Sequence, residues 1–349
     1  DSVRDFLAAN WPAEKAVDRA TDPAAIGAVW KDLAAQGLAA LGTNPEEGGL
    51  REILLAFEEL GRGACPVPML GAVTANLLLV GASDAKAKAL LAAIAQGTAR
   101  VAVSLGAFDG DASAGKASVA GGKLNGRFPF VEDGAGATHF IALCDAPAGV
   151  AIAEVGASVK IAETPGMARP ALSEVNCSGA PATFVEVPRA ALEDAAMAAR
   201  IACASRALGA AQRAFDLAVE HAKVRKQFDQ LIGSFQAIQH KLANSLIHLE
   251  GSRLLLEQAA DARDAGAKDW KVFAAAAVAF ASPALREVAV QNHRALGAIG
   301  YAEEHEAPRH FRRVHTDVAR FGGAPSAKEM LADRKSTRLN SSHGYISYA

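Results

Sequence analysis

The stretch VRKQFDQLIGSFQAIQHKLAN, residues 224–244, joins two segments whose apolar residues recur with a helical period. One helix is predicted to end near Val224, and the next apolar stripe begins at Leu231. Arg225 and Phe228 are therefore expected in the short turn between them. A guanidinium suits a pyrophosphate because its planar donors meet phosphate oxygens two at a time, and an aromatic side chain could cover a ring system. An Arg-Lys pair at a helix end is otherwise solvated or balances the helix dipole, so both interpretations stay open here.

The length and charge balance of the chain limit what it can be. A chain of 349 residues is too long for one compact core and predicts about two or three domains. Hydrophobic residues make up 51% of it, so a sizeable core is available. The 36 basic and 38 acidic residues give a net charge of −2, which provides no long-range field for nucleic acid or an acidic membrane surface. We expect no nucleic-acid partner, no membrane partner and a cytoplasmic enzyme.

The cysteines and histidines give no metal signature. The four cysteines are far apart in sequence and lack the paired spacing of metal sites, so they are predicted to be reduced structural thiols. They are Cys65, Cys144, Cys177 and Cys203. Three histidines of the C-terminal part have no ligand spacing with a nearby carboxylate motif and are predicted to pack in the core or on the surface. They are His240, His248 and His293.

The ends of the chain and its most apolar segment indicate where in the cell the protein is expected. The chain opens DSVRDFLAAN, without an initiator Met or a cationic start, and we expect a fragment that lacks a secretory signal. The most apolar helix, around residues 273–281, has charged flanks and is expected to be too short to cross a bilayer. Residues 333–349, DRKSTRLNSSHGYISYA, resemble the translation of a sequencing adapter. We interpret them as an artefact and expect the natural C-terminus to be missing.

Residues 1–97 read as helices. The segments WPAEKAV and DPAAIGAVWKDLAAQGLAAL carry apolar residues at spacings of three and four, with Asp22 and Pro23 as a cap and first-turn pair. REILLAFEELGR continues this pattern, and Pro66 and Pro68 end it. A helical N-terminal domain is predicted.

The residue composition and the spacing of apolar residues change at about Thr98. Residues 98–190 contain short runs such as ARVAVSLGAF, ATHFIALC and ATFVEV, divided by Gly, Asn, Asp and Pro, which is typical of β-strands with tight turns. From 191 to 332 the helical period returns, and an apolar stripe there is predicted to face other helices. The stripe consists of Ile232, Phe235, Ile238, Leu242, Leu246, Leu249 and Leu256. The predicted fold class is mainly α with a β domain.

Three strings resemble one known family. RKQFDQLIGSFQAIQHKLAN strongly resembles the first turn and helix of the C-terminal bundle in acyl-CoA dehydrogenases. NPEEGGL with LLAFEELGRGACPVPML resembles the N-terminal domain of that family, and LGAIGYAEEHEAPRHFRR resembles its Gly-rich turn before the last helices. The matches cover most of the chain from Gly42 to Arg313. The resemblance implies an N-terminal helical domain, a middle β-barrel domain and a C-terminal four-helix bundle.

The resemblance implies FAD as the cofactor. In the family, the Arg of this motif reaches across a subunit interface to the flavin pyrophosphate, an aromatic lies against the adenine, and a Gln adds polar contacts. These positions are Arg225, Gln227, Phe228, Phe235 and Gln236. In the Gly-rich turn, Gly297 and Gly300 are expected to let the backbone approach a cofactor phosphate. Arg294 replaces the Gln that usually precedes this turn, and Gln291 lies one turn earlier.

The β domain departs from the family pattern. VSLGAFDG stands where the family has a Thr-Glu-Pro loop beside the flavin, which leaves Ser104 as the one hydroxyl in register. Phe130, in RFPFVEDG, holds the position of the family's Trp. The resemblance therefore assigns Ser104 and Phe130 to flavin binding, with fewer hydroxyl groups in contact with the flavin than is usual in the family.

The catalytic base is missing from both of its family positions. Dehydrogenation needs a carboxylate that removes a proton from the α-carbon of the thioester. One family position lies nine residues after a conserved Arg, and counting from Arg312 it is Phe321. The other precedes an Arg that is present as Arg200, assigned to the substrate, and it is Ala199. Three acids could replace the base but are expected to form a solvated helix start; they are Glu303, Glu304 and Glu306. The catalytic residue is left unassigned.

The resemblance leaves three functions open. The first is an FAD-dependent acyl-CoA dehydrogenase subunit of lipid metabolism that introduces an α,β double bond into an acyl-CoA and passes electrons to an electron-transfer flavoprotein. It would form a homo-tetramer or a hetero-tetramer with a sister subunit. The chain resembles the short subunits of mixed α2β2 actinobacterial enzymes for steroid side chains, so the second is a non-catalytic partner whose sister brings the Glu. The third is other flavin chemistry, such as hydroxylation or nitroalkane oxidation.

Overall fold

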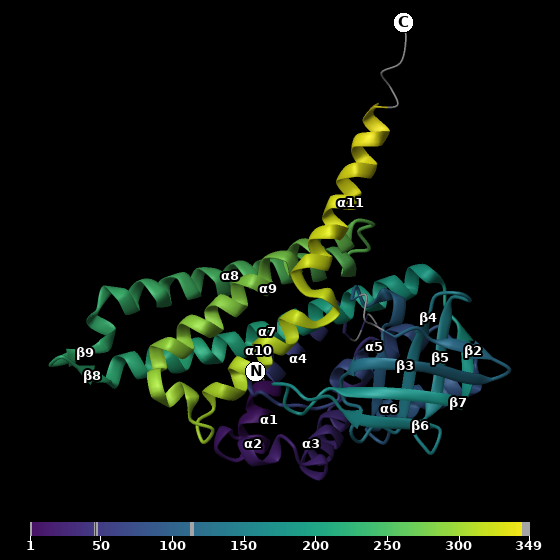
Figure 1. The fold of residues 1–349 in the computed structure, drawn as a ribbon, viewed down its shortest axis with the longest axis horizontal. Helices are drawn as coiled ribbons and strands as arrows, with labels where there is room; N and C mark the ends of the chain where they lie inside the picture. The colour runs from purple at the N-terminus through teal and green to yellow at the C-terminus, as the bar shows by residue number, and fades with distance from the viewer. Residues whose placement is uncertain (1, 45, 47, 112–114, 344–349) are drawn as a thin grey trace, which may run out of the picture.

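The computed structural model describes residues 2–44, 46, 48–111 and 115–343, and Figure 1 shows an elongated molecule with helices at one end and strands at the other. The N-terminal helices are α1 (Ser2–Asn10), α2 (Ala13–Arg19), α3 (Pro23–Ala35), α4 (Leu50–Arg62), α5 (Met69–Leu79) and α6 (Ala85–Ala95), with a short 3-10 helix η1 (Leu38–Ala40). As predicted, Asp22 caps α3, because its carboxylate accepts a hydrogen bond from the backbone N–H of Ala24 at 2.9 Å.

The middle of the chain forms a mixed sheet that curls around its own core. Its strands are β1 (Val101–Ser104), β2 (Ser118–Ala120), β3 (Lys123–Val131), β4 (His139–Cys144), β5 (Gly149–Glu154), β6 (Val159–Glu163) and β7 (Ser173–Glu186), with a 3-10 turn η2 (Gly106–Phe108) after β1. The order is β1-β4-β5-β7-β3-β2, with β6 also on β7. Only β1 and β4 pair in parallel among these strands. Phe128, Phe140 and Val175, from three strands, share one buried cluster.

The C-terminal part is a bundle of long helices with a small projecting hairpin. Its elements are α7 (Arg189–Val224), β8 (Lys226–Gln227), β9 (Gln230–Leu231), η3 (Ile232–Ser234), α8 (Gln236–Asp264), α9 (Trp270–Leu296), η4 (Gly297–Tyr301), α10 (Ala307–Ala319), η5 (Arg320–Gly322) and α11 (Gly323–His343). The predicted order of helices, β domain and bundle is confirmed. The boundaries at 97/98, 190/191 and 332/333 stay predictions, and α11 runs through residue 333 without a break.

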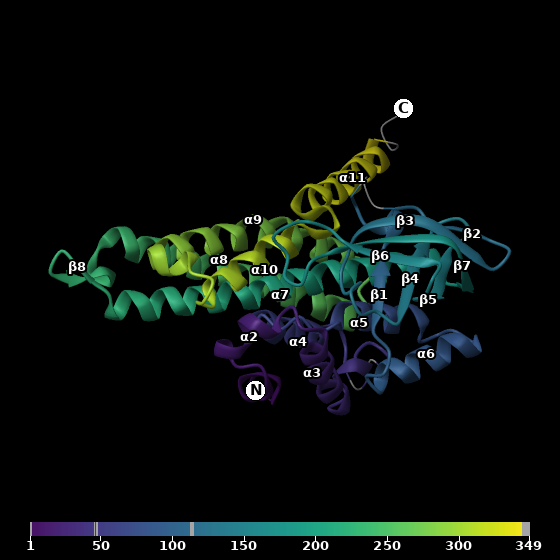
Figure 2. The same ribbon diagram turned by 60° about the horizontal axis from the view of Figure 1, so that its bottom comes forward.

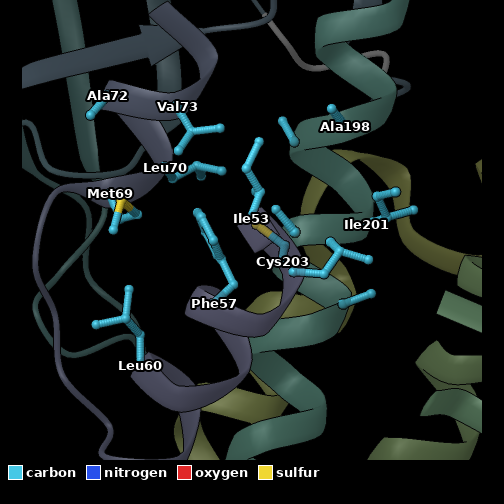
Figure 3. Close-up of a cluster of buried hydrophobic side chains, with 14 of the residues drawn as sticks. Ile53, Phe57, Leu60, Met69, Leu70, Ala72, Val73, Ala198, Ile201 and Cys203 are labelled. Carbon is cyan, nitrogen blue, oxygen red and sulfur yellow. The ribbon is translucent and has the colours of Figure 1, made fainter. Parts of the chain in front are cut away.

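The main core lies where α4 and α5 pack on α7, as Figure 3 shows. Phe57 of α4 is fully buried there. Two glycines let α4 and α7 cross with their backbones in contact. A Cβ on Gly61 would lie 1.9 Å from the carbonyl oxygen of Arg206, and one on Gly209 would lie 1.8 Å from that of Glu58. The four cysteines are buried and free, which confirms their assignment as structural thiols.

Two expectations about the bundle were wrong. The predicted apolar stripe is buried at Leu249 and Leu256, but Leu246 is 45% exposed, because the first half of α8 extends towards the hairpin at the end of the molecule. The apolar segment around residues 273–281 is also longer than expected. The helical stretch Trp270–Tyr301 is long and apolar enough to cross a bilayer, and 56% of its most apolar window is buried inside this protein. Packing of α9 between other helices accounts for that apolar character.

Candidate functional site

A cavity of about 370 Å³ opens between the end of β3 and the end of α10, and we call it the β3–α10 cavity. Its wall includes Asp109, Phe130, Met167, His315 and Phe321. The structure thus brings together Phe130, which holds the family's Trp position, and Phe321, which holds a family Glu position. Most of the wall is apolar, with carboxyl and imidazole groups at its edge.

Both phenylalanines have strained backbones. Phe130 has φ 56° and Phe321 has φ 55°, in the left-handed region that non-glycine residues seldom occupy. Each such residue costs of the order of 1–3 kcal/mol, and such strain concentrates at functional sites. Phe321 is 7% exposed, and the guanidinium of Arg320 lies 4.6 Å from its ring centroid. Phe130 is 49% exposed and faces the cavity.

A buried ion network joins β3 to α7 and α10 behind this cavity. Arg206, 1% exposed, donates to Glu132 at 2.6 and 2.8 Å and to Asp317 at 2.8 Å from two nitrogens. Arg320 also pairs with Glu132, and Arg313 lies 3.5 Å from Asp317. Burial works to raise the pKa of Glu132, but the charges of Arg206 and Arg320 hold it well below its usual range. The network therefore ties the end of β3 and the last turn of α10 to the middle of α7.

Arg200 is also buried, and it holds the turn that follows β1. Its Nη2 donates to the carbonyl oxygens of Phe108 and Asp109, both at 2.9 Å. Burial lowers the pKa of Arg200 while Asp109 opposes this shift. Gly110 completes the turn with φ 82°, and a Cβ there would lie 2.5 Å from Nη2 of Arg200. The predicted role of Arg200 in binding substrate stays a prediction.

A second cavity of about 390 Å³ lies on the other side of Arg200, between α7, α9 and α11. Its wall includes Phe108, Met197, Lys271 and Met330 besides Arg200. Flexible methionine side chains fit irregular apolar ligands, and a lysine at the wall can meet an anion. Ser104 lies at the end of β1, 7% exposed, and its Oγ accepts a hydrogen bond from the N–H of Gly106 at 3.3 Å.

The hairpin of β8 and β9 carries most of the predicted cofactor residues. Arg225 caps the C-terminus of α7, which ends at Val224 as predicted, and its side chain is exposed. Phe228 and Asp229 form the two-residue turn with φ 52° and 62°, and Phe228 is 88% exposed. Phe235 meets Phe228 edge to face with ring centroids 6.2 Å apart. A strained turn that displays a phenyl ring to water is costly for the chain alone.

The other residues predicted for the cofactor lie near the same end of the bundle. Gln227 and Gln236 are exposed in the hairpin and at the start of α8, and Arg294 is exposed in the last turn of α9. Gly297 has φ 64° and open space around it. The neighbouring Gly300 is required by packing, since a Cβ there would lie 2.9 Å from the carbonyl oxygen of His293.

The predicted site residues therefore form two separate groups. Arg200, Ser104 and Phe130 lie on the side of the β domain, whereas the hairpin lies at the opposite end of the long axis in both Figure 1 and Figure 2. Arg200 and Arg225 are both placed by α7, 25 residues apart, which corresponds to about 37 Å along a helix. One ligand held by both groups must be shared between two chains.

The glutamates and the histidine that the sequence offered as alternative catalytic groups have other surroundings. Glu303 pairs with Arg312 and Glu304 is exposed, as a solvated helix start predicts. Glu306 departs from that expectation because it is half-buried between Arg213, at 2.6 Å, and His310, at 3.2 Å. His293 packs against aromatic rings, with the ring of Tyr301 4.5 Å away. Within the described ranges, His, Cys, Asp and Glu form no cluster of three or more able to hold a metal ion.

One carboxyl group in the cavity wall has no counterpart in the family pattern. Asp109 lies in the string VSLGAFDG, where the family resemblance points to a hydroxyl group and so to Ser104. In the structure, Asp109 rather than Ser104 lines the β3–α10 cavity. The ion network was not predicted either, because Glu132, Arg206 and Asp317 are distant in sequence and share no motif.

Comparisons with known proteins agree on one family. Residues 1–98 match the family model described as acyl-CoA dehydrogenase, N-terminal domain, and residues 189–333 match the model of its C-terminal domain. The acyl-CoA dehydrogenase IpdE2 of Mycobacterium tuberculosis is 28% identical over 312 residues, which are 87% of this chain and 85% of that protein. A 3-(aryl)acrylate reductase of Clostridium sporogenes is 40% identical over 134 residues, and the match spans only 34% of its length.

Solved structures show the same fold over nearly the whole chain. A variant of the Tcur3481-Tcur3483 steroid ACAD is 26% identical with a TM-score of 0.86, and the match covers 97% of this chain and 96% of that one. The ChsE4-ChsE5 complex from Mycobacterium tuberculosis has a TM-score of 0.79 at 21% identity, with coverage of 96% and 97%. The second likeness is one of fold alone.

Proposed function

This chain belongs to the acyl-CoA dehydrogenase family, and from that premise we propose that it is a subunit of an FAD-dependent acyl-CoA dehydrogenase. The reaction is the introduction of an α,β double bond into an acyl-CoA thioester, with electrons passed to an electron-transfer flavoprotein, and we place it in the cytoplasm. The observation that carries the proposal is the separation of the hairpin from the β3–α10 cavity. In this proposal, the hairpin of one chain and the β3–α10 cavity of a neighbouring chain together form one site.

The residues present fit FAD at both ends. Phe130, Met167 and Phe321 give the cavity apolar walls suited to a planar ring, and its volume of about 370 Å³ leaves room for one. The hairpin offers the guanidinium of Arg225 for the pyrophosphate and the exposed ring of Phe228 for the adenine. When bound, the flavin supplies an acceptor for a hydride from the substrate's β-carbon.

The substrate is proposed to occupy the space on either side of Arg200. Arg200 fixes the turn of residues 106–110, which forms part of the wall of both cavities. In the second cavity, Met197 and Met330 provide an adaptable apolar lining, while Lys271 in the wall pairs with Asp194 at 2.7 Å. Phe321 limits the access of water to the β3–α10 cavity.

The assembly is proposed to be a tetramer, either of this chain or with a sister subunit. Exposed apolar side chains of the bundle support an interface there: Val224 is 73%, Phe228 88%, Ile247 65% and Leu254 63% exposed. The Tcur3481-Tcur3483 enzyme and the ChsE4-ChsE5 complex are each named for two different chains. Ala199 and Phe321 favour a second candidate, a non-catalytic subunit that completes the flavin site of a sister carrying the Glu.

The test is the complex itself. The full chain, purified with a candidate sister subunit, is expected to be yellow, to contain FAD and to bleach when an acyl-CoA is added. Replacing Arg225 by Ala should release most of the FAD, whereas Lys223→Ala, which removes an exposed cation two residues earlier, should leave the FAD content unchanged. A colourless wild-type complex would contradict the proposal.

Two further measurements separate the remaining candidates. Turnover recovered in the isolated chain by Phe321→Glu or Ala199→Glu would identify a homomeric enzyme that has lost its base. Oxygen consumption without any acyl-CoA would instead indicate hydroxylation or another flavin chemistry.

A further inference from the structure

The turn after β1 lies beside Phe321, one position where the family carries its base, and beside Arg200, which follows the other position. Arg200, the neighbour of Ala199, donates to the carbonyl oxygen of Asp109 at 2.9 Å. On the other side, a Cβ on Gly110 would lie 2.9 Å from the carbonyl oxygen of Phe321. The segment of residues 108–110 is therefore packed between Arg200 and Phe321.

This turn itself carries a carboxyl group, that of Asp109. The residue closes the short helix η2, its N–H donates to the carbonyl oxygen of Gly106 at 3.1 Å, and its side chain is half-buried in the wall of the β3–α10 cavity. Phe130 and Phe321 line the same space. Asp109 thus lines a cavity whose wall also holds Phe130, at the family's Trp position, and Phe321, at one of its Glu positions.

The surroundings of Asp109 shift its pKa upwards, in the direction that a general base needs. Burial raises its pKa; Arg320 of η5 and Arg200 of α7 work to lower it, and Asp111 adds to the rise. His315 of α10 faces the same cavity. A general base is most effective when its pKa lies close to the working pH, and a carboxyl group reaches that range only when its environment raises its pKa.

We propose that Asp109 is the general base of this site and replaces the glutamate that Ala199 and Phe321 lack. The proposal rests on the proposed function, because it requires an acyl-CoA in the cavity. In the proton step, the C–H bond at the α-carbon of the thioester breaks and an O–H bond forms on the carboxylate of Asp109. The electron pair stays on the thioester as its enolate, and return of a proton reverses the step without any oxidant.

This half-reaction can be followed by itself. Phenylacetyl-CoA has acidic α-protons and no hydrogen on a saturated β-carbon, so it can exchange protons but cannot be dehydrogenated. The full chain, incubated with it in D₂O, should replace its α-protons by deuterium faster than buffer alone, as measured by proton NMR. Asp109→Asn should slow that exchange by about 100-fold or more, the usual contribution of general base catalysis. The matched control Glu186→Gln, an exposed carboxylate at the end of β7, should exchange at the wild-type rate.

Three outcomes decide the matter. Equal exchange rates in wild type and Asp109→Asn, with equal affinity for phenylacetyl-CoA by calorimetry, would overturn the role of Asp109 and leave the proposed function standing. If the wild type binds the thioester neither alone nor in the FAD-containing complex, both fall together. Support would be retained affinity, slowed exchange, and a wild-type rate that rises with pH while that of Asp109→Asn stays flat, with Asp109→Glu recovering part of the rate. Because burial disfavours the charged form, Asp109→Asn should unfold at the same temperature as wild type or higher at pH 7.

Discussion

The two ends of this molecule treat their charged and aromatic groups in opposite ways. Behind the β3–α10 cavity, Arg206 is 1% exposed and bonds two carboxylates, so this ion network is complete within one chain. At the hairpin, Arg225 lies in water and Phe228 is 88% exposed in a strained turn. Residues at the first end should therefore control folding, whereas residues at the second should control assembly and cofactor binding.

The largest expected effect on folding is at Arg206. Replacement by Ala removes the cation that both buried carboxylates share and leaves Glu132 with Arg320 alone and Asp317 with Arg313 at 3.5 Å. The loss should lower the free energy of unfolding by about 3 kcal/mol. Urea denaturation followed by circular dichroism measures it. The control is Arg127→Ala, whose side chain is 73% exposed and pairs with Glu174, and it should leave the free energy of unfolding nearly unchanged. A loss at Arg206 as small as that of the control would remove the contrast between the two ends.

The next effect is at the crossing of α4 and α7, which holds the core under the cavity. Gly209→Ala would place a Cβ 1.8 Å from the carbonyl oxygen of Glu58, so the helices must move apart, at about 1–3 kcal/mol. Gly81→Ala serves as control because nothing lies within 4 Å of its Cβ position. Thermal unfolding should separate the two variants by several degrees. Equal melting temperatures would show that the crossing is looser than the structure indicates.

Local patterns predicted the fold well where the cause is local. The cap at Asp22 and the end of α7 at Val224 follow from neighbouring residues, and both are present. The apolar stripe of α8 failed at Leu246 because burial depends on what lies opposite a helix, and the helical period cannot specify that. The apolar segment around residues 273–281 was expected to end at its charged flanks, but α9 continues through them to Leu296.

The site was predictable in part. The family resemblance located the residues of the hairpin and of the cavity, yet it could not show that about 37 Å of α7 separates Arg200 from Arg225. Asp109 was overlooked because a motif search asks for the residue that the family has, and here a different one carries the polar group. The partners of Arg206 are brought together only by tertiary packing.

A smaller and pH-dependent effect is expected at Glu306, which is half-buried between the two ends. Burial works to raise its pKa, but hydrogen bonds from His310 and Arg213 hold the pKa below its usual range. A depressed pKa stabilises the fold above the unfolded-state pKa of about 4.3, and that stability is lost as the pH falls. Glu306→Gln should therefore cost about 1–2 kcal/mol at pH 7 and progressively less below about pH 4.

Glu303→Gln is the matched control for this variant, since Glu303 pairs with Arg312 but its side chain is 66% exposed. It should change the free energy of unfolding by less than about 1 kcal/mol at either pH. If both variants lose stability equally and without pH dependence, the pairing of Glu306 with Arg213 contributes nothing specific.

The smallest effect on folding is expected at Phe228, and it is the sharpest test of the comparison. Its ring already lies in water in the single chain, so Phe228→Ala should leave the unfolding of that chain within about 0.5 kcal/mol of wild type, or stabilise it slightly. In the complex, the same change should weaken FAD binding, because an aromatic contact of about 1 kcal/mol or more is lost, and equilibrium dialysis measures this. A variant that destabilises the isolated chain would instead assign the ring to folding, and the hairpin would lose its role as a contact made for a neighbouring subunit.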